Sequence, residues 1–252
     1  MQTTLFAMIL ASSAFASDHN NIDSGRPLRF DDAYSIGFGE RAIEYGLSSA
    51  WLRGGSSIYG GKFEFKYGFA MNRDIGISFS PSYSTEANRF NAGEIELSYF
   101  QQIQREIDNA PALAFKLDVG LPADREGSGI DARLRGIMTK NAGQYDKFHI
   151  NVDAMYSSNP HPGERDVRFG AILGYSNPLG APTKFDKTFV AQFALEQGRM
   201  NGEGFTGNIG IGIRKQVSEQ GVFDFGIESD IFAPSGSRKS PIRLILGYSV
   251  GF

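Results

Sequence analysis

The stretch Pro241-Ile-Arg-Leu-Ile-Leu-Gly-Tyr-Ser-Val-Gly-Phe252 decides the fold class of this chain. Alternate positions from Ile242 to Phe252 are apolar or aromatic, while the positions between them hold arginine, glycine and serine together with Ile245. Successive side chains of a β-strand point to opposite faces, so the stretch predicts a strand whose two faces meet different environments. Either a second sheet or lipid could cover the apolar face, and the rest of the chain has to decide between them.

The composition of the 252-residue chain limits the classes of function. Its 25 basic and 28 acidic residues give a formal charge of −3, so we expect no nucleic-acid partner. The chain has no cysteine, which excludes disulfides and thiolate metal sites. The 31 glycines are useful where a sheet curves tightly or a lumen stays open. We expect no metal and no cofactor.

The amino-terminal region predicts export. Leu5 to Ala16 is a short apolar segment that ends in the small-x-small site Ala14-Phe15-Ala16, so we interpret residues 1–16 as a cleaved signal peptide. No later window approaches the roughly 20 apolar residues of a membrane helix, so a membrane crossing would require strands. We expect residues 17–39 to form a periplasmic segment and residues 40–252 to form a single barrel domain.

From Glu40 onward, alternating segments are separated by Gly, Pro, Asn, Asp and Ser. Each segment is long enough for a tilted membrane crossing of about 10 residues. The longer connections, rich in Gly, Ser and Pro, fall on one side and the shorter turns on the other, which places both chain ends in the periplasm. We expect about twelve strands, near 40–53, 59–72, 74–86, 92–105, 111–122, 130–141, 145–158, 165–177, 186–198, 204–217, 221–233 and 241–252.

Every expected strand has one apolar face and one charged or small face. Phe63, Phe65 and Tyr67 alternate with Glu64 and Lys66, for example. The single tryptophan and many tyrosines fall near strand ends, as two membrane interfaces require. These features predict an all-β fold, a transmembrane antiparallel up-and-down β-barrel of about 12 strands, over the rival of a soluble two-sheet domain.

The carboxyl terminus also predicts how such a barrel is assembled. Tyr248, Val250 and Phe252 share the apolar face of the final strand, and the chain stops on an aromatic residue. This pattern resembles the signal by which bacterial outer-membrane barrels are recognised for assembly. We therefore expect two partners, the lipid of a Gram-negative outer membrane and the barrel-assembly machinery, the latter through the C-terminal strand.

A motif precedes the first strand. Arg26, Pro27, Leu28, Asp31, Asp32 and Ala33 are followed by Gly39-Glu40 and by Ile43-Glu44-Tyr45-Gly46. These residues resemble the start of the MetA-pathway phenol-degradation family of outer-membrane transporters, in which an Arg-Pro-Leu-x-x-Asp-Asp-Ala segment precedes the first strand. The motif covers about a tenth of the chain. The resemblance implies a barrel and a transport role, and it identifies no substrate.

Two interpretations of this segment are open. It could be an ordered periplasmic lead-in pinned by Pro27, which we favour. Alternatively, Arg26, Arg29, Asp31 and Asp32 could enter the periplasmic mouth of the barrel and restrict it. Leu28 and Phe30 require an apolar site in either case.

The inward faces of the strands carry the candidate pore-lining residues. Simple hairpin pairing would bring Asp118 to Arg133 and Asp230 to Arg243. Such charges either form structural ion pairs that fill a narrow barrel or line a selective pore. The candidates are Lys62, Glu64, Lys66, Glu94, Glu96, Lys116, Asp118, Arg133, Arg135, His149, Asp153, Arg168, Arg214, Asp224, Glu228, Asp230 and Arg243.

A catalytic interpretation is weaker. His149 shares its face with Asn151 and Asp153, but no serine lies two positions away, so we interpret His149 as a hydrogen-bonded lumen residue and expect no enzyme activity. The sequence predicts a channel for passive uptake of small solutes, and the family resemblance implies organic solutes, aromatic ones included. The alternatives are a structural or adhesive barrel with a plugged lumen, or an outer-membrane enzyme with a catalytic cluster at its rim.

Overall fold

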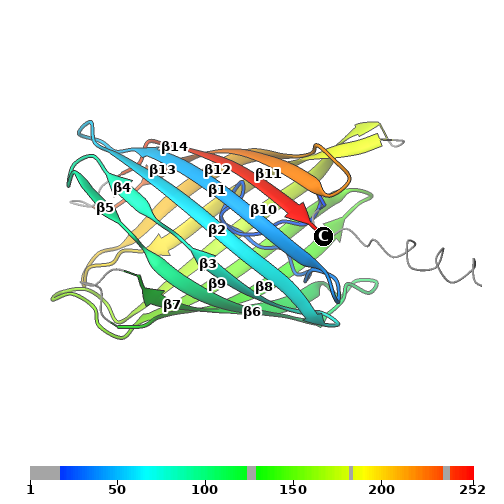
Figure 1. The fold of residues 1–252 in the computed structure, drawn as a ribbon, viewed down its shortest axis with the longest axis horizontal. Coiled ribbons are helices and arrows are strands. Elements are labelled where there is room, and N and C mark those ends of the chain that lie inside the picture. Colours follow the sequence, from blue (N-terminus) through cyan, green and yellow to red (C-terminus); the bar gives the residue numbers. More distant parts are fainter. Residues whose placement is uncertain (1–17, 124–128, 182–183, 235–238) are drawn as a thin grey trace, which may run out of the picture.

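The computed structural model describes residues 18–123, 129–181, 184–234 and 239–252 (Figure 1). The predicted signal peptide, residues 1–16, lies outside the described residues. Within these ranges the chain forms a closed antiparallel barrel of twelve crossing strands. Its strands are β1 Arg41–Trp51, β2 Ser57–Ala70, β3 Arg73–Phe79, β4 Ser82–Ser84, β5 Arg89–Asn91, β6 Glu94–Gln104, β7 Ala112–Pro122, β8 Asp131–Ala142, β9 Asp146–Ser157, β10 Val167–Ala181, β11 Lys184–Gln197, β12 Phe205–Gln216, β13 Gly221–Phe232 and β14 Ile242–Gly251.

The barrel closes between its first and last strands. β14 pairs with β1 along its length, with Leu246 opposite Leu47, and β1 also pairs with β2. The short strands β4 and β5 pair with each other and continue the paths of β3 and β6. The predicted all-β barrel is therefore confirmed. We call the end where β1 begins and β14 finishes the termini end, and the opposite end the loop end.

Two details differ from the predicted strands. The segment expected at 74–86 is divided into β3 and β4, because Pro81 has no N–H to donate, although its carbonyl still accepts from the Gly61 N–H at 2.8 Å. The turn between the strands expected at 165–177 and 186–198 is shorter, since Pro178 and Leu179 remain in β10 opposite Thr188 and Lys187. Proline is tolerated there near the strand end.

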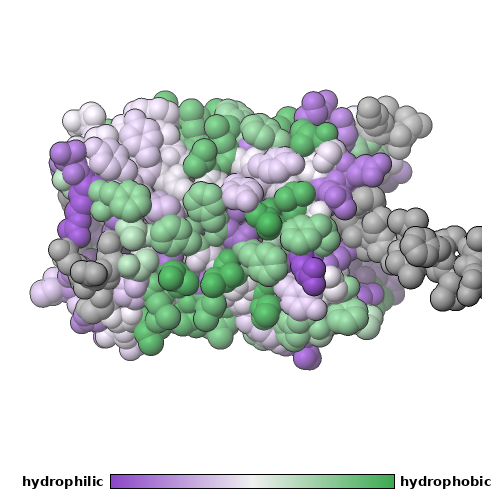
Figure 2. Space-filling model, viewed as in Figure 1, coloured by the Kyte–Doolittle hydropathy of each residue, from purple (hydrophilic) through white to green (hydrophobic). Residues whose placement is uncertain are grey.

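The outward faces form an apolar belt. Figure 2 shows hydrophobic side chains gathered over the middle of the wall and hydrophilic ones at both ends. Phe65, Leu97, Phe169 and Ile211 are among the exposed apolar residues on this surface. Among the described residues, no helix is long and apolar enough to span a membrane.

Segment 18–39 lies inside the barrel, in its termini-end half (Figure 1, dark blue). Of the two interpretations, the favoured periplasmic lead-in is wrong for these residues, and the entry of Arg26, Arg29, Asp31 and Asp32 into the lumen describes them. The segment makes polar contacts with the inner faces of strands around the whole barrel. Its partners include Glu44 on β1, Lys66 on β2, Asp74 on β3, Gln102 on β6, Lys116 on β7, Arg135 on β8, Asn151 on β9, Thr188 on β11, Arg214 on β12 and Glu228 on β13.

Apolar side chains explain why the segment enters. Ile22, Leu28 and Phe30 are fully buried in one cluster with inward-facing residues of β10 and β11, among them Val190. Ala33 packs into a second cluster with residues of β6, β7 and β8. Burying each such side chain stabilises the lumen position by about 1.5–3 kcal/mol relative to exposure.

Wall glycines let the segment approach closely. A Cβ on Gly226 would overlap the Pro27 carbonyl, and a Cβ on Gly174 would lie 2.7 Å from the ring of Phe30. The Cβ on Gly226 would lie 2.3 Å from the Pro27 oxygen, and both contacts are shorter than a carbon atom tolerates. These positions therefore require glycine while the segment is in place. The glycines at these two positions thus allow a filler to lie close to the wall, whereas the roles that we expected were tight curvature of the sheet or an open lumen.

Candidate functional site

A large cavity occupies the loop-end half of the barrel. Its volume is about 1220 Å³, and six arginines and eight carboxylates are among its lining residues. Side chains of both charges in one space make it suitable for a polar or charged solute. The charged residues are Arg29, Arg133, Arg165, Arg168, Arg199, Arg243, Glu94, Glu96, Asp118, Asp131, Glu164, Glu196, Glu203 and Asp230.

The charges of the cavity alternate around its wall. Arg133 contacts Asp118 at 2.6 Å, as predicted from hairpin pairing, and Arg168 contacts Glu196 at 3.1 Å. The second predicted pair is wrong. Arg243 bonds to Glu228 at 2.8 Å, because these two residues are directly opposite in the β13–β14 register.

Asp230 has other partners. It accepts from the Asn208 side chain at 3.0 Å and from the Ser240 N–H at 2.8 Å. Within the described part of the chain, positive and negative groups therefore interdigitate along the loop-end wall and do not form two opposed walls.

Two loops contribute residues that the strand pattern did not identify. The segments around Glu164 and Met200 form an isolated bridge, and the Arg165 N–H donates to the Arg199 carbonyl at 2.9 Å. Glu164, Arg165, Arg199 and Glu203 consequently line the cavity. Alternation predicts inward positions only along strands, so residues on loops had no signal in the sequence.

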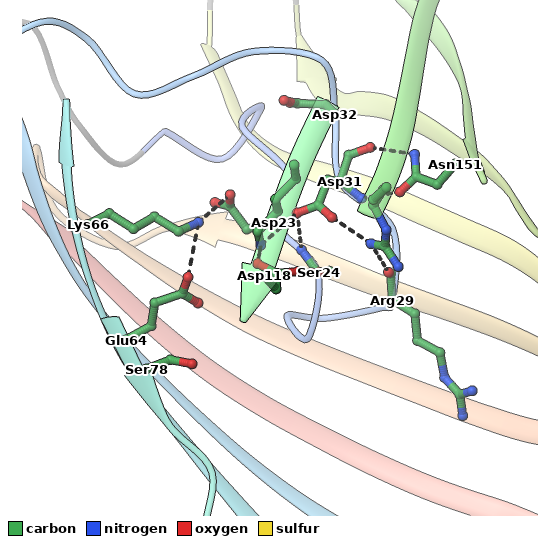
Figure 3. A network of polar contacts seen from close by, with 12 residues as sticks. Asp23, Ser24, Arg29, Asp31, Asp32, Glu64, Lys66, Ser78, Asp118 and Asn151 are labelled. Atoms are coloured by element: carbon green, nitrogen blue, oxygen red, sulfur yellow. Dashed lines mark hydrogen bonds and ion pairs between the residues drawn. The ribbon is translucent and has the colours of Figure 1, made fainter. Parts of the chain in front are cut away.

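The termini-end half of the barrel interior contains a buried polar network around segment 18–39 (Figure 3). Arg135 donates to Asp31 at 2.5 Å and to Asp153 at 2.7 Å, and all three side chains are buried. Asn151 donates to the Asp31 carbonyl at 3.0 Å and accepts from the Asp31 N–H at 2.7 Å. These bonds fix the segment to β8 and β9.

A second buried group fixes the segment to the opposite strands. Lys66 contacts Asp23 at 2.5 Å and lies 3.4 Å from Glu44, and Figure 3 shows Lys66 and Asp23 pointing toward each other. Arg26 pairs with Glu44 and lies 3.5 Å from Asp224. Removing one member would leave a charge buried without its partner, which is the costly change for such groups.

His149 is a hydrogen-bonded interior residue, but one neighbour was missed. Its Nδ1 lies 3.0 Å from the Thr139 hydroxyl and its Nε2 lies 2.9 Å from the Ser176 hydroxyl. Ser176 comes from β10 and not from the strand of His149, so spacing within one strand could not reveal it. All three residues are buried, and the ring of Phe30 lies 5.0 Å from that of His149. Segment 18–39 thus covers this serine–histidine pair.

The predicted inward residues fall into three groups. Glu94, Glu96, Asp118, Arg133, Arg168, Asp230 and Arg243 line the loop-end cavity. Lys62 lines two smaller cavities of about 330 Å³ each. Glu64, Lys66, Lys116, Arg135, His149, Asp153, Arg214, Asp224 and Glu228 are buried in the interior.

Arg29 lies between the loop-end cavity and the buried network of segment 18–39. It lines the large cavity and both smaller ones, and 27% of its side chain is exposed, compared with 3% for Arg26. In Figure 3 its side chain leads away from the buried network. The guanidinium contacts Glu228 at 2.9 Å and lies 3.9 Å from Glu196.

Of the C-terminal residues predicted as an assembly signal, Tyr248 and Val250 lie on the closing strand β14 and Phe252 directly follows it. The Phe252 N–H donates to the Arg41 carbonyl at 2.9 Å, and its carbonyl accepts from the Arg41 N–H at 3.1 Å. The side chains of Phe252 and Tyr248 are exposed, while Val250 is half-buried.

Comparison with known proteins establishes the fold class. No family model and no curated protein matches the chain. Among solved structures it is similar to the COG4313 outer membrane channel from Pseudomonas putida F1, with 15% identity, a TM-score of 0.67, and coverage of 92% of this chain and 100% of that one. It is also similar to the NanC porin, with 11% identity, a TM-score of 0.57, and coverage of 84% and 98%. The CymD monoaromatic hydrocarbon channel has 11% identity, a TM-score of 0.52, and coverage of 86% and 89%. The chain therefore has the fold of outer-membrane barrel channels.

Proposed function

We propose that the protein is an outer-membrane channel for passive movement of small solutes, restricted by segment 18–39. The observation that carries this proposal is the polar cavity of about 1220 Å³ inside a wall whose outer surface is apolar. A barrel that served only as a membrane anchor would gain nothing from so large a charged cavity, whereas a channel needs a polar entry chamber. The fold shared with channels and porins supports the same role.

Orientation follows from the connections. With the termini end in the periplasm, the cavity faces the cell exterior and segment 18–39 closes the periplasmic half. A solute would enter the cavity and reach Arg29. It would pass through the barrel only when segment 18–39 is displaced from its contacts with the wall. Apart from its apolar clusters, the segment is held by ion pairs and hydrogen bonds, which can exchange partners in the presence of water or a charged solute.

The solute class is part of the proposal. The motif Arg26 to Ala33 resembles the MetA-pathway phenol-degradation family, and the fold is shared with the CymD monoaromatic hydrocarbon channel. We propose small organic molecules, aromatic ones included, as the solutes. The cavity lining includes Met155 and Met200 beside its charged residues, so an aromatic ring would find apolar contacts there.

A structural barrel with a plugged lumen is the second candidate. It is favoured by the buried pairs that fix segment 18–39 to both sides of the wall, such as Arg135 with Asp153 and Arg26 with Glu44. The serine–histidine pair under Phe30 does not favour an enzyme, since both hydroxyl and imidazole are buried.

Conductance in planar bilayers distinguishes the two candidates. The purified protein should conduct small ions, and liposomes that contain it should swell in solutions of permeant organic solutes. A folded preparation that neither conducts nor permits swelling, with heat-modifiable migration on gels as the fold control, would establish the plugged barrel instead.

Insertion into the outer membrane through the assembly machinery is also proposed, from the closing position of β14. Removal of Phe252 deletes two backbone hydrogen bonds to Arg41 together with the aromatic end of the signal, so assembled protein in outer-membrane fractions should fall several-fold. Phe38→Ala, which removes an exposed aromatic side chain outside the strands and leaves the backbone in place, serves as the control. Equal amounts of assembled protein in the two variants would refute a role for the terminal residue.

A further inference from the structure

The charged residues of the N-terminal segment do not all perform the same task. The side chains of Arg26 and Asp31 are 3% and 2% exposed and bind the wall on the side away from the large cavity. Arg29 is 27% exposed and reaches into the large cavity and both smaller ones. We propose that Arg29 is a binding site for the carboxylate group of a small organic acid that enters the loop-end cavity. This proposal refines the channel role by naming the solute class.

The partners of Arg29 lower the free-energy cost of breaking its ion pairs. Arg29 pairs with Glu228, but Glu228 also accepts from Arg243 at 2.8 Å and from Gln192 at 2.9 Å. The other nearby carboxylate, Glu196, accepts from Arg168 at 3.1 Å. If Arg29 turns toward a solute, each carboxylate that it leaves keeps an arginine. No buried charge is then left without a partner, which is the usual cost of opening an ion pair.

Arg135 shows what a fixed arginine looks like in the same barrel. Its guanidinium spans Asp31 and Asp153, and its side chain is 2% exposed. Its Nη1 also donates to the Arg29 carbonyl at 2.9 Å, so it holds the backbone at the base of the Arg29 side chain. The Arg29 N–H donates to Gln192 at 2.8 Å. A fixed backbone beneath a side chain with replaceable partners is suited to binding a ligand.

The chemistry of the guanidinium selects the ligand class. A guanidinium presents paired N–H groups that match the two oxygens of a carboxylate, and such charge-assisted bonds are stronger than neutral ones. The cavity of about 1220 Å³ has ample space for a ligand the size of benzoate beside Met155. A neutral analogue of the same shape, benzamide, would lose the ionic part of the interaction.

Binding is measured without reliance on conduction. Calorimetric titration of the detergent-solubilised full chain with benzoate should give saturable binding, and benzamide should bind about 10-fold or more weakly. Arg29→Gln should weaken benzoate binding about 10-fold, with Arg29→Lys intermediate because the charge remains and the fork is lost.

Arg53→Gln is the matched control. Arg53 is an exposed arginine at the loop end of the barrel, and it lines none of the three cavities. Its loss removes the same charge outside the proposed site, so benzoate affinity should change less than about 3-fold. Heat-modifiable migration confirms that each variant is folded.

The outcomes separate this proposal from the channel role. Absence of benzoate binding, equal binding of benzamide, or equal weakening in the Arg29 and Arg53 variants would overturn the carboxylate site. Benzoate binding that depends on Arg29 in a protein that does not conduct would retain the site and refute the channel.

Discussion

The two halves of the barrel interior follow one sequence pattern and reach different physical states. In the termini-end half, inward charges such as Lys66 and Arg135 are buried against segment 18–39. In the loop-end half, inward charges such as Glu96 and Arg133 line a cavity of about 1220 Å³. What differs is the presence of the segment, so the environment of a lumen charge is set by what fills the barrel and not by the strand that carries it.

The largest effect is expected from Arg135→Gln. The change leaves Asp31 and Asp153 buried without their shared cation, and the free energy of unfolding should fall by about 3–5 kcal/mol. Because Asp31 also anchors the segment, conductance in planar bilayers should rise. Thermal unfolding in detergent and single-channel recording provide the two measurements. Wild-type stability of this variant would show that the buried charges of the termini-end half do not depend on their partners.

A mutation of the wall tests the close approach of the segment. Gly226→Ala places a Cβ on the Pro27 carbonyl, and this overpacking should cost about 1–3 kcal/mol or displace the segment and increase conductance. Gly136→Ala is the control, because a Cβ at that position has no neighbour within 4 Å. Similar behaviour of the two variants in stability and conductance would show that the segment does not constrain the wall.

The smallest change in stability is expected from Arg133→Gln. Arg133 is partly exposed but Asp118 is buried, and Asp118 keeps Lys116 at 3.8 Å, so loss of the Arg133 pair should cost about 1–2 kcal/mol. Removal of one positive charge from the cavity should nevertheless shift the reversal potential across a salt gradient toward cation selectivity. An unchanged reversal potential in a conducting, folded variant would indicate that ions do not pass this residue.

The wall of the barrel could be predicted from sequence because alternation is a local property. Each inward or outward position depends only on parity along a strand, and the expected ranges agree with the strands to within a few residues, apart from the division at Pro81 and the longer hairpin at Pro178. The same parity put Asp118 and Arg133 on one face, and the β7–β8 register agrees with the simple hairpin pairing that was expected. Asp230 and Arg243 required the register of β13 on β14, which alternation does not specify.

The filling of the lumen was harder to predict, although one signal was present. Ile172, Val190 and Ile245 are apolar residues at inward positions, and the inward residues before and after each of them are polar or glycine. An apolar side chain would be unfavourable there if the lumen held water, and all three are buried. Such exceptions to a polar inner face indicate an apolar filler, and Leu28 and Phe30 in the motif are the apolar residues that pack with Ile172 and Val190. The cavity residues on loops, Arg165 and Arg199, depend on tertiary contacts that strand alternation does not encode.

The distribution of partners around segment 18–39 has a consequence for biogenesis. The segment precedes every strand in the chain, yet its partners range from Glu44 on β1 to Glu228 on β13. An incomplete sheet offers only part of these partners, so the segment gains its full set when β14 meets β1. Ordering of segment 18–39 is therefore coupled to the last step of assembly. Closure of the barrel and packing of the segment inside it should occur as one cooperative event.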